Sequence, residues 1–185
     1  MNNYKEENRN RLIRLLNQVK ENKEPPGWIH VASIAVGGLA CIGFSKKRPY
    51  VLAVSSGGRG VIDCATGEKL DRDYEEYGGL DDSGLYCEGI GHIQNETILM
   101  AGIYGGGLPL SNGLGDSLEA VSPNWPEVDL ILCSNYKDAL IEGHQSECFV
   151  MMRDYLRAYG FSWCGNFIIA ATGSDLDIWK RQSQL

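Results

Sequence analysis

Histidine and cysteine side chains are the first candidates for chemistry in this chain, which has three histidines and six cysteines. A histidine beside a thiol or a carboxylate can act as a general base toward a nucleophile. Cys87 and His92 lie close together in sequence, five positions apart. An odd separation places two residues on opposite faces of a continuous strand, unless an intervening glycine breaks the strand. His30 lies in a strand-like run and is expected in the core. A hydrolase-like enzyme of an unrecognised family, using His92 or His144 with Cys87 or a carboxylate, therefore stays an open alternative.

Standard catalytic and metal-binding motifs are missing from this sequence. It contains no H-E-x-x-H, no C-x-x-C and no G-x-S-x-G pattern. We therefore predict no metal site and no cofactor. The cysteines lie mostly among apolar or glycine neighbours, where a cysteine behaves as a small buried hydrophobe.

An acidic segment at residues 71–82, with the sequence DRDYEEYGGLDD, holds six carboxylates and one arginine. Four of the carboxylates match ligand positions 1, 3, 5 and 12 of an EF-hand loop. The sixth position requires glycine for a sharp turn and is Glu76 here, so calcium binding is disfavoured. The default interpretation is a solvated acidic loop.

A binding interpretation of the same segment is an acidic patch that meets a basic protein, with tyrosines as contact anchors. Trp125 lies between prolines in SPNWPE and is the tryptophan that we expect to be exposed at such an interface. The predicted partner surface consists of Asp73, Tyr74, Glu75, Glu76, Tyr77 and Trp125.

A glycine-rich loop at Gly105–Gly115 follows an apolar run. It lacks the lysine of a phosphate-binding P-loop. Gly105 and Gly107 fit the dinucleotide-binding fingerprint, but Leu110 occupies its third glycine position. We therefore interpret this segment as a surface loop or a partner-binding loop.

The element that begins the chain is a predicted helix over residues 4–23, which Pro25, Pro26 and Gly27 end. Its apolar stripe is formed by Leu12, Leu15, Leu16 and Val19. This stripe is expected to pack on the main body or on a second copy of the chain, which would make the protein a homo-oligomer.

The remainder of the chain is predicted to be rich in strands. Short β-branched runs separated by polar or glycine turns fill residues 28–103, and a further strand is expected at 127–134. Residues 147–159 carry apolar side chains at helical spacing and predict a helix, which precedes a closing strand at 166–173.

Residues 50–70 resemble a hairpin of a quinoprotein-type propeller blade, and residues 167–181 resemble the end of a WD-type blade. This resemblance implies strand–turn–strand geometry and no function.

These elements predict an α+β fold. We expect an antiparallel β-sheet or partly closed barrel, with an N-terminal helix and one helix before the last strand. The chain is interpreted as a single domain over residues 1–185, with a helical extension at 1–24 and a β-rich body at 28–185.

The charge of the chain sets the expected partners. The formal net charge is −7 and the sequence pI is about 5.0. Such a surface repels nucleic-acid phosphates and favours a basic partner. The polar start of the chain, together with the lack of a membrane-length apolar run, predicts a cytoplasmic protein that does not bind membranes. We therefore expect an acidic binding protein. In size and charge it is similar to the small acidic immunity proteins that neutralise toxins.

Overall fold

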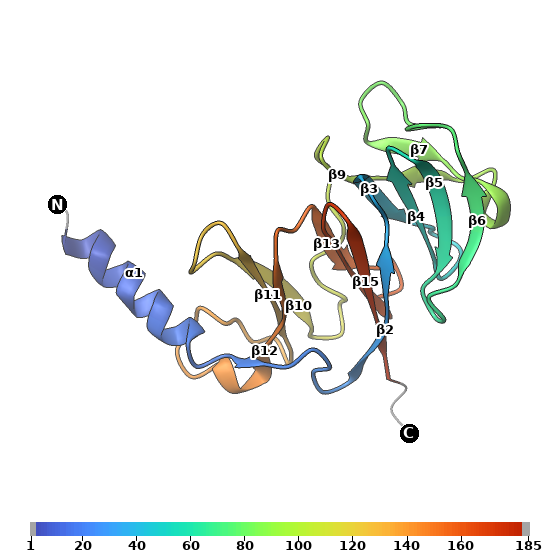
Figure 1. Cartoon of the computed structure of the whole chain (residues 1–185). Helices are drawn as coiled ribbons and strands as arrows, with labels where there is room; N and C mark the ends of the chain where they lie inside the picture. The colour runs from blue at the N-terminus through green and yellow to red at the C-terminus, as the bar shows by residue number, and fades with distance from the viewer. Residues whose placement is uncertain (1–2, 183–185) are drawn as a thin grey trace. The chain divides into compact units, whose positions relative to one another are not determined.

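The computed structural model in Figure 1 describes residues 3–182. The chain divides into two compact units. The first consists of the residues up to Pro26 together with Gly113–Tyr155, and the second of Gly27–Asn112 together with the residues from Leu156 on. The predicted division into residues 1–24 and 28–185 does not follow these boundaries, and the single domain stays a prediction. Each unit is described by itself.

The first unit contains helix α1 and a four-stranded sheet in the order β1-β12-β11-β10. Strand β1 is parallel to β12, and the other pairs are antiparallel. A core cluster lies between these elements and includes Val19, Ile131, Cys148 and Val150. The elements are α1 (Asn3–Leu16), β1 (Lys20–Glu21), β10 (Ser117–Val121), β11 (Val128–Cys133), the 3-10 helix η2 (Gln145–Glu147) and β12 (Cys148–Asp154).

Helix α1 ends earlier than the predicted helix over residues 4–23. Beyond Leu16 the backbone tightens, and the N–H of Val19 donates to the carbonyl oxygen of Leu16 at 3.0 Å. Val19 then enters the core, and Lys20 pairs with Phe149 of β12. The burial of Val19 and the pairing of β1 therefore replace the last predicted turns of helix.

The predicted helix over residues 147–159 is wrong. Residues 148–154 form strand β12, which pairs with β11 along its length, and a second strand begins at Ala158. The run of apolar residues at 148–152 fits a buried strand as well as a helix, so its periodicity does not distinguish the two. The neighbouring strand β11, which is buried from Asp129 to Cys133, supplies the backbone partners that decide the outcome.

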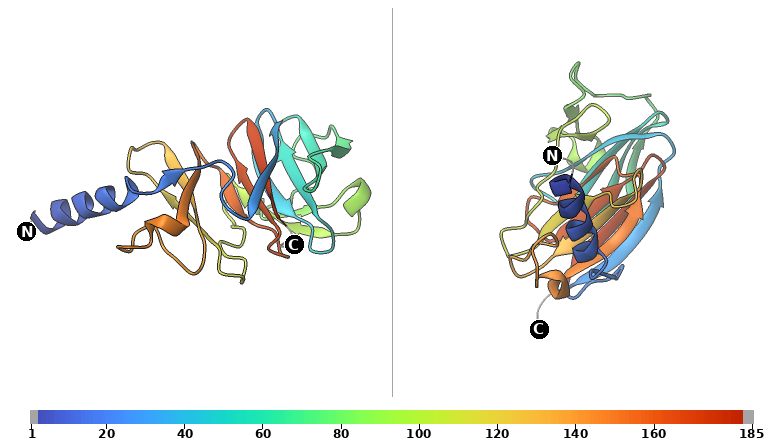
Figure 2. Two further views of the ribbon diagram at one scale, coloured as in Figure 1. Left: turned by 90° about the horizontal axis from the view of Figure 1, so that it is seen from below. Right: turned by 90° about the vertical axis from the view of Figure 1, so that its left-hand side faces the viewer.

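The second unit is built almost entirely of antiparallel strands, shown from two further directions in Figure 2. Its sheets have the orders β13-β14-β15-β2, β6-β5-β4-β3-β9 and β7-β8. The elements are β2 (Trp28–Ala35), β3 (Leu39–Phe44), β4 (Tyr50–Ser55), β5 (Gly58–Asp63), β6 (Lys69–Asp73), β7 (Tyr86–Glu88), the 3-10 helix η1 (Gly91–Ile93), β8 (Thr97–Leu99), β9 (Ala101–Gly102), β13 (Ala158–Phe161), β14 (Phe167–Ala171) and β15 (Asp175–Arg181).

The five-stranded sheet of this unit is buried on both faces. In β4, Val51 and Ala53 join the core cluster shared with β2, β14 and β15, whereas Leu52 and Val54 join a second cluster under β7 and β8. Alternate residues of a strand point to opposite faces, so a run that is apolar throughout suits this position.

The α+β class, with antiparallel sheets and an N-terminal helix, is confirmed. None of the sheets in the part of the chain that the structure describes closes into a barrel. Within residues 3–182, no helix is long and apolar enough to cross a membrane.

Candidate functional site

The acidic segment 71–82 begins on β6 and continues into the loop before β7. The Asp71 carboxylate accepts a bond from the backbone N–H of His92 at 2.8 Å and lies 2.9 Å from the Nδ1 atom of the same ring. Asp73 pairs with the guanidinium of Arg59 at 2.9 Å. Both carboxylates are therefore held against neighbouring elements of their own unit.

Bonds from the protein also lower the pKa of two carboxyl groups in this segment. The backbone N–H of Glu75 and the Arg59 guanidinium lower the pKa of Asp73. The Ser83 hydroxyl lowers the pKa of Asp81, whose carboxylate also accepts bonds from two backbone N–H groups further along the loop. The hydrogen bonds that these two carboxylates accept fix the conformation of the loop.

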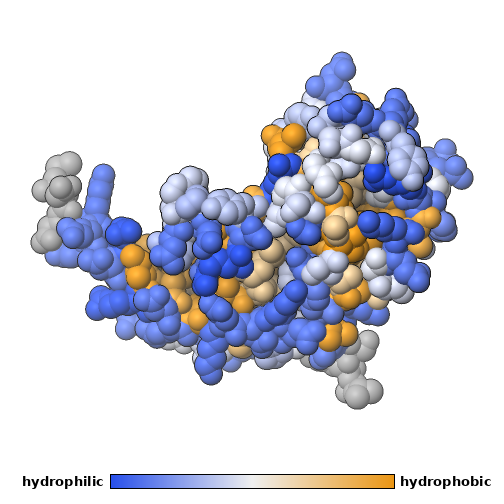
Figure 3. Space-filling model, viewed as in Figure 1, coloured by the Kyte–Doolittle hydropathy of each residue, from blue (hydrophilic) through white to orange (hydrophobic). Residues whose placement is uncertain are grey.

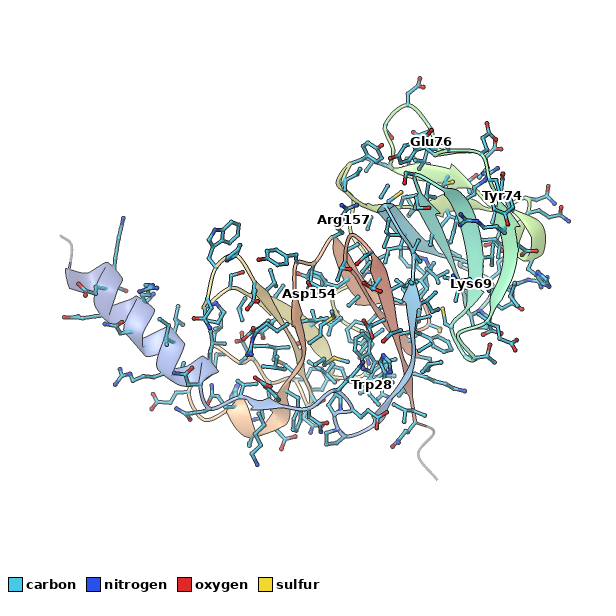
Figure 4. All side chains as sticks on the ribbon, viewed as in Figure 1. Trp28, Lys69, Tyr74, Glu76, Asp154 and Arg157 are labelled. Carbon is cyan, nitrogen blue, oxygen red and sulfur yellow. The ribbon has the colours of Figure 1, made fainter. Side chains whose placement is uncertain are left out.

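The exposed part of the segment is Tyr74, Glu75 and Glu76. The side chain of Tyr74 is 82% exposed, and the Arg72 guanidinium lies 5.2 Å from its ring centre. Within the described part of the chain, neither glutamate side chain has a hydrogen bond or ion pair. Figure 3 shows hydrophilic side chains over the loop above β7, and Figure 4 labels Glu76 near this loop and Tyr74 beside β6. The three side chains are thus free to meet a partner.

Tyr77 and Trp125 lie differently from these three residues. Tyr77 is half-buried, has a positive φ of 50° and packs against the core cluster under β7 and β8, so it anchors the loop from inside. Trp125 belongs to the first unit, where it is 82% exposed and lines a groove of about 800 Å³ beside α1. The two parts of the predicted partner surface are therefore on different units.

A cavity of about 510 Å³ adjoins the acidic segment and was not anticipated from the sequence. Its walls come from the end of β2 and from β4, β5 and β6. Lys69 donates to the carbonyl oxygen of Ala35 at 3.2 Å, and Arg72 donates to that of Gly57 at 2.5 Å. The sequence signal that could have pointed to this cavity is the pair of cations Lys69 and Arg72 at the start of an acidic run. The residues of β2, β4 and β5 that complete the cavity are distant in sequence, so no local pattern identifies them.

A serine–histidine–aspartate cluster joins β2 and β15. Asp177 Oδ1 lies 2.7 Å from His30 Nε2 and 2.5 Å from Ser33 Oγ. A catalytic triad places the acid and the nucleophile on opposite ring nitrogens. Here the aspartate and the serine both lie at Nε2 of His30, and the serine hydroxyl donates to the aspartate. We therefore interpret the cluster as a structural contact between β2 and β15.

Among the described residues, neither His92 nor His144 forms a hydrogen bond with Cys87, the thiol suggested as their partner. His92 does meet a carboxylate, that of Asp71, and its side chain is half exposed. Cys87 is buried, its sulfur lies 4.0 Å from Arg59 Nη1, and burial raises the pKa of its thiol. His144 Nδ1 accepts a bond from the N–H of Asp138. The enzyme alternative, which uses His92 or His144 with Cys87 or a carboxylate, stays a prediction, and the contact of this kind that the structure shows is that of His92 with Asp71.

Five of the six cysteines are buried, and the sixth, Cys164, is exposed. Burial raises the pKa of the Cys41 thiol to about 12, which leaves it protonated and unreactive at neutral pH. Across residues 3–182, no group of three histidine, cysteine or acidic side chains is arranged to hold a metal ion.

The glycine-rich loop Gly105–Gly115 carries the chain from one unit to the other, since the boundary falls between Asn112 and Gly113. Gly106 has a positive φ of 78° and approaches the Met100 backbone so closely that a Cβ atom would clash. Close backbone approach thus accounts for at least this glycine. A role for the loop in partner binding stays a prediction.

Comparison with known proteins adds no functional information. No family model matches the chain, and no curated protein matches it.

Proposed function

We propose that this chain is a non-catalytic, cytoplasmic binding protein that captures a basic protein partner through Tyr74, Glu75 and Glu76. The observation that supports this proposal is that some carboxylates of the acidic segment are bonded within the protein and others are not. Asp71, Asp73 and Asp81 are engaged by their own unit, whereas Tyr74, Glu75 and Glu76 are exposed and neither glutamate side chain has a hydrogen bond or ion pair in the described part of the chain. An immunity-type protein that neutralises a basic toxin is the class that this surface fits best.

The energetics of the loop favour such a role. A loop held in one shape loses less conformational entropy on binding than a mobile one. An exposed tyrosine supplies contact area at low entropic cost, and clustered carboxylates accelerate the approach of a cationic partner. Arg72 beneath the Tyr74 ring limits the positions that the ring adopts.

The proposal is tested by reversing the two uncommitted charges, with Glu75→Lys and Glu76→Lys combined. Partners captured from a lysate of the source cells are identified, purified and mixed with wild type and variant in a stopped-flow instrument. We expect the association rate constant at low salt to fall by about tenfold or more, because the steering charge is reversed. The Tm should not change, since neither side chain bonds within the described part of the chain.

A matched control carries the same change in net charge elsewhere, as Glu68→Lys combined with Glu142→Lys, two exposed positions outside the acidic segment. It should retain most of the wild-type association rate. An equal loss in both double variants would show a general charge effect and would contradict a site at the loop. Asp73 is left unchanged, because its removal would also break the Arg59 pair.

A further inference from the structure

The geometry points to a second binding site, in which the cavity of about 510 Å³ beside β6 takes a small organic anion. Its anionic group would meet Lys69 and Arg72, and its flat or apolar part would lie on the floor formed by β4 and β5. The site goes beyond the proposed capture of a protein partner and does not depend on it.

The cations at this cavity carry the argument for an anion. Lys69 and Arg72 border the same cavity, so two positive charges lie at its edge. Lys69 and Arg72 form no ion pair with any residue of the described part, and each instead donates to a backbone carbonyl oxygen. Asp71 also borders the cavity, and its carboxylate is engaged by His92. Two positive charges are therefore left uncompensated at one opening.

Arg72 is also oriented before any ligand arrives. Its Nη2 atom donates to the carbonyl oxygen of Gly57, and its guanidinium lies over the Tyr74 ring. A guanidinium has five N–H donors in a fixed fork, so one such bond leaves several for a carboxylate or phosphate. Figure 4 labels Lys69 and Tyr74 on the β6 side of this unit.

The floor of the cavity is kept open by small residues, which include Ala53 and Gly60. A Cβ atom at Gly60 would lie 3.4 Å from the Asp71 carbonyl oxygen and 3.8 Å from Arg72 Nη1, which are ordinary contacts. The backbone therefore does not require glycine at this position. A glycine within a strand costs stability, so its presence here fits a site where a ligand must approach the backbone.

The size and lining of the cavity suit a small molecule. Ligand pockets commonly measure about 300–1,000 Å³ and combine apolar walls with a few polar groups. Val36 and Ile62 contribute apolar residues to the lining beside the two cations. A molecule with one anionic group and one planar ring, such as a nucleoside monophosphate or an aromatic carboxylate, matches this combination.

The test uses isothermal titration calorimetry on the full-length protein with four probes. Adenosine 5′-monophosphate and 4-hydroxybenzoate each carry an anion and a ring, adenosine lacks the charge, and inorganic phosphate lacks the ring. We expect at least one of the first two probes to bind with a Kd below about 1 mM, and adenosine and phosphate to bind at least about tenfold more weakly. Failure of both organic anions to bind, or equal binding of adenosine, would overturn the proposal.

Variants place the bound probe in the cavity. Arg72→Gln removes the fork of donors, and Gly60→Val fills the floor without changing charge; each should weaken binding by about tenfold or more. Lys47→Gln, in the exposed turn between β3 and β4, is the matched control and should bind as wild type does. Unchanged binding by both cavity variants would overturn the assignment. The Glu75→Lys and Glu76→Lys double variant should still bind the probe, which separates this site from the proposed protein partner.

Discussion

At the scale of single residues, the acidic segment shows that identical side chains have different roles because of their neighbours. Asp73 is engaged by Arg59 and by the backbone N–H of Glu75, whereas Glu76 three residues later has no partner in the described part of the chain. A carboxylate that accepts bonds in the folded protein stabilises the fold through its charged form. A carboxylate without such bonds gives no such stabilisation, and for Glu76 we propose a role in recognition.

Asp73→Asn should lower the Tm at neutral pH, because the Arg59 guanidinium loses its charged partner. The folded protein holds the pKa of Asp73 below its ordinary value. The stabilisation is therefore complete above the pKa of the unfolded chain, about 3.9, and is lost as the pH falls through the lower pKa of the folded state. The difference in Tm between wild type and variant should shrink as the pH is lowered below about 4.

Differential scanning fluorimetry across this pH range measures that difference. The matched control is Glu76→Gln, whose Tm should follow that of the wild type at every pH. A Tm difference for Asp73→Asn that does not vary with pH would contradict an electrostatic role for the pair.

At the scale of elements, β3 is a strand that its neighbours enclose completely. All six of its residues are buried, and β4 and β9 pair with its two edges. Gly43 passes close to the end of β8, where a Cβ atom would clash with the Leu99 carbonyl oxygen and lie 2.6 Å from a methyl carbon of Ile98. This glycine is required by the close approach of two backbones and not by a turn.

Gly43→Ala should lower the free energy of unfolding by about 1–3 kcal/mol, because the extra methyl group must displace a neighbouring backbone. Gly37→Ala provides the comparison, since a Cβ atom there would meet nothing within 4 Å. That variant should keep the wild-type stability or exceed it slightly. Urea denaturation followed by tryptophan fluorescence measures both, and equal stabilities would refute the close approach at β3.

At the scale of the whole molecule, the chain leaves and re-enters each unit, so neither unit is a continuous segment. The first unit has an incompletely covered helix. Leu15 of α1 is buried, but Leu12, Ile13 and Leu16 are only half-buried and line the groove that Trp125 also borders. Figure 3 shows a hydrophobic strip beside this helix. An incompletely covered amphipathic helix supports the prediction of self-association through α1.

Self-association through α1 predicts a mass in solution of at least twice the 20.4 kDa of one chain. Leu12→Asp should reduce the mass to that of a monomer, because a charge in the apolar stripe must be desolvated at the interface. Asn10→Asp adds the same charge on the opposite, exposed side of the helix and should leave the mass unchanged. Size-exclusion chromatography with light scattering gives the result, and a monomeric wild type would refute the prediction.

Much of the fold follows from the sequence by itself. The strands around Trp28–Ala35, Tyr50–Ser55 and Val128–Cys133, and the presence of an N-terminal helix, were predictable because β-branched content and apolar periodicity are local properties. The exposure of Tyr74 and Trp125 was predictable for the same reason, since acidic and proline-rich neighbours keep a segment at the surface.

Only the tertiary structure decided the remaining features. The apolar run at 148–152 satisfies both periodicities, and pairing with β11 selected the strand. Arg59 determined that Asp73 shapes the loop, although 14 residues separate them. The walls of the anion cavity come from four strands, and which residues face one another across a sheet is a property of register and packing that no local pattern encodes.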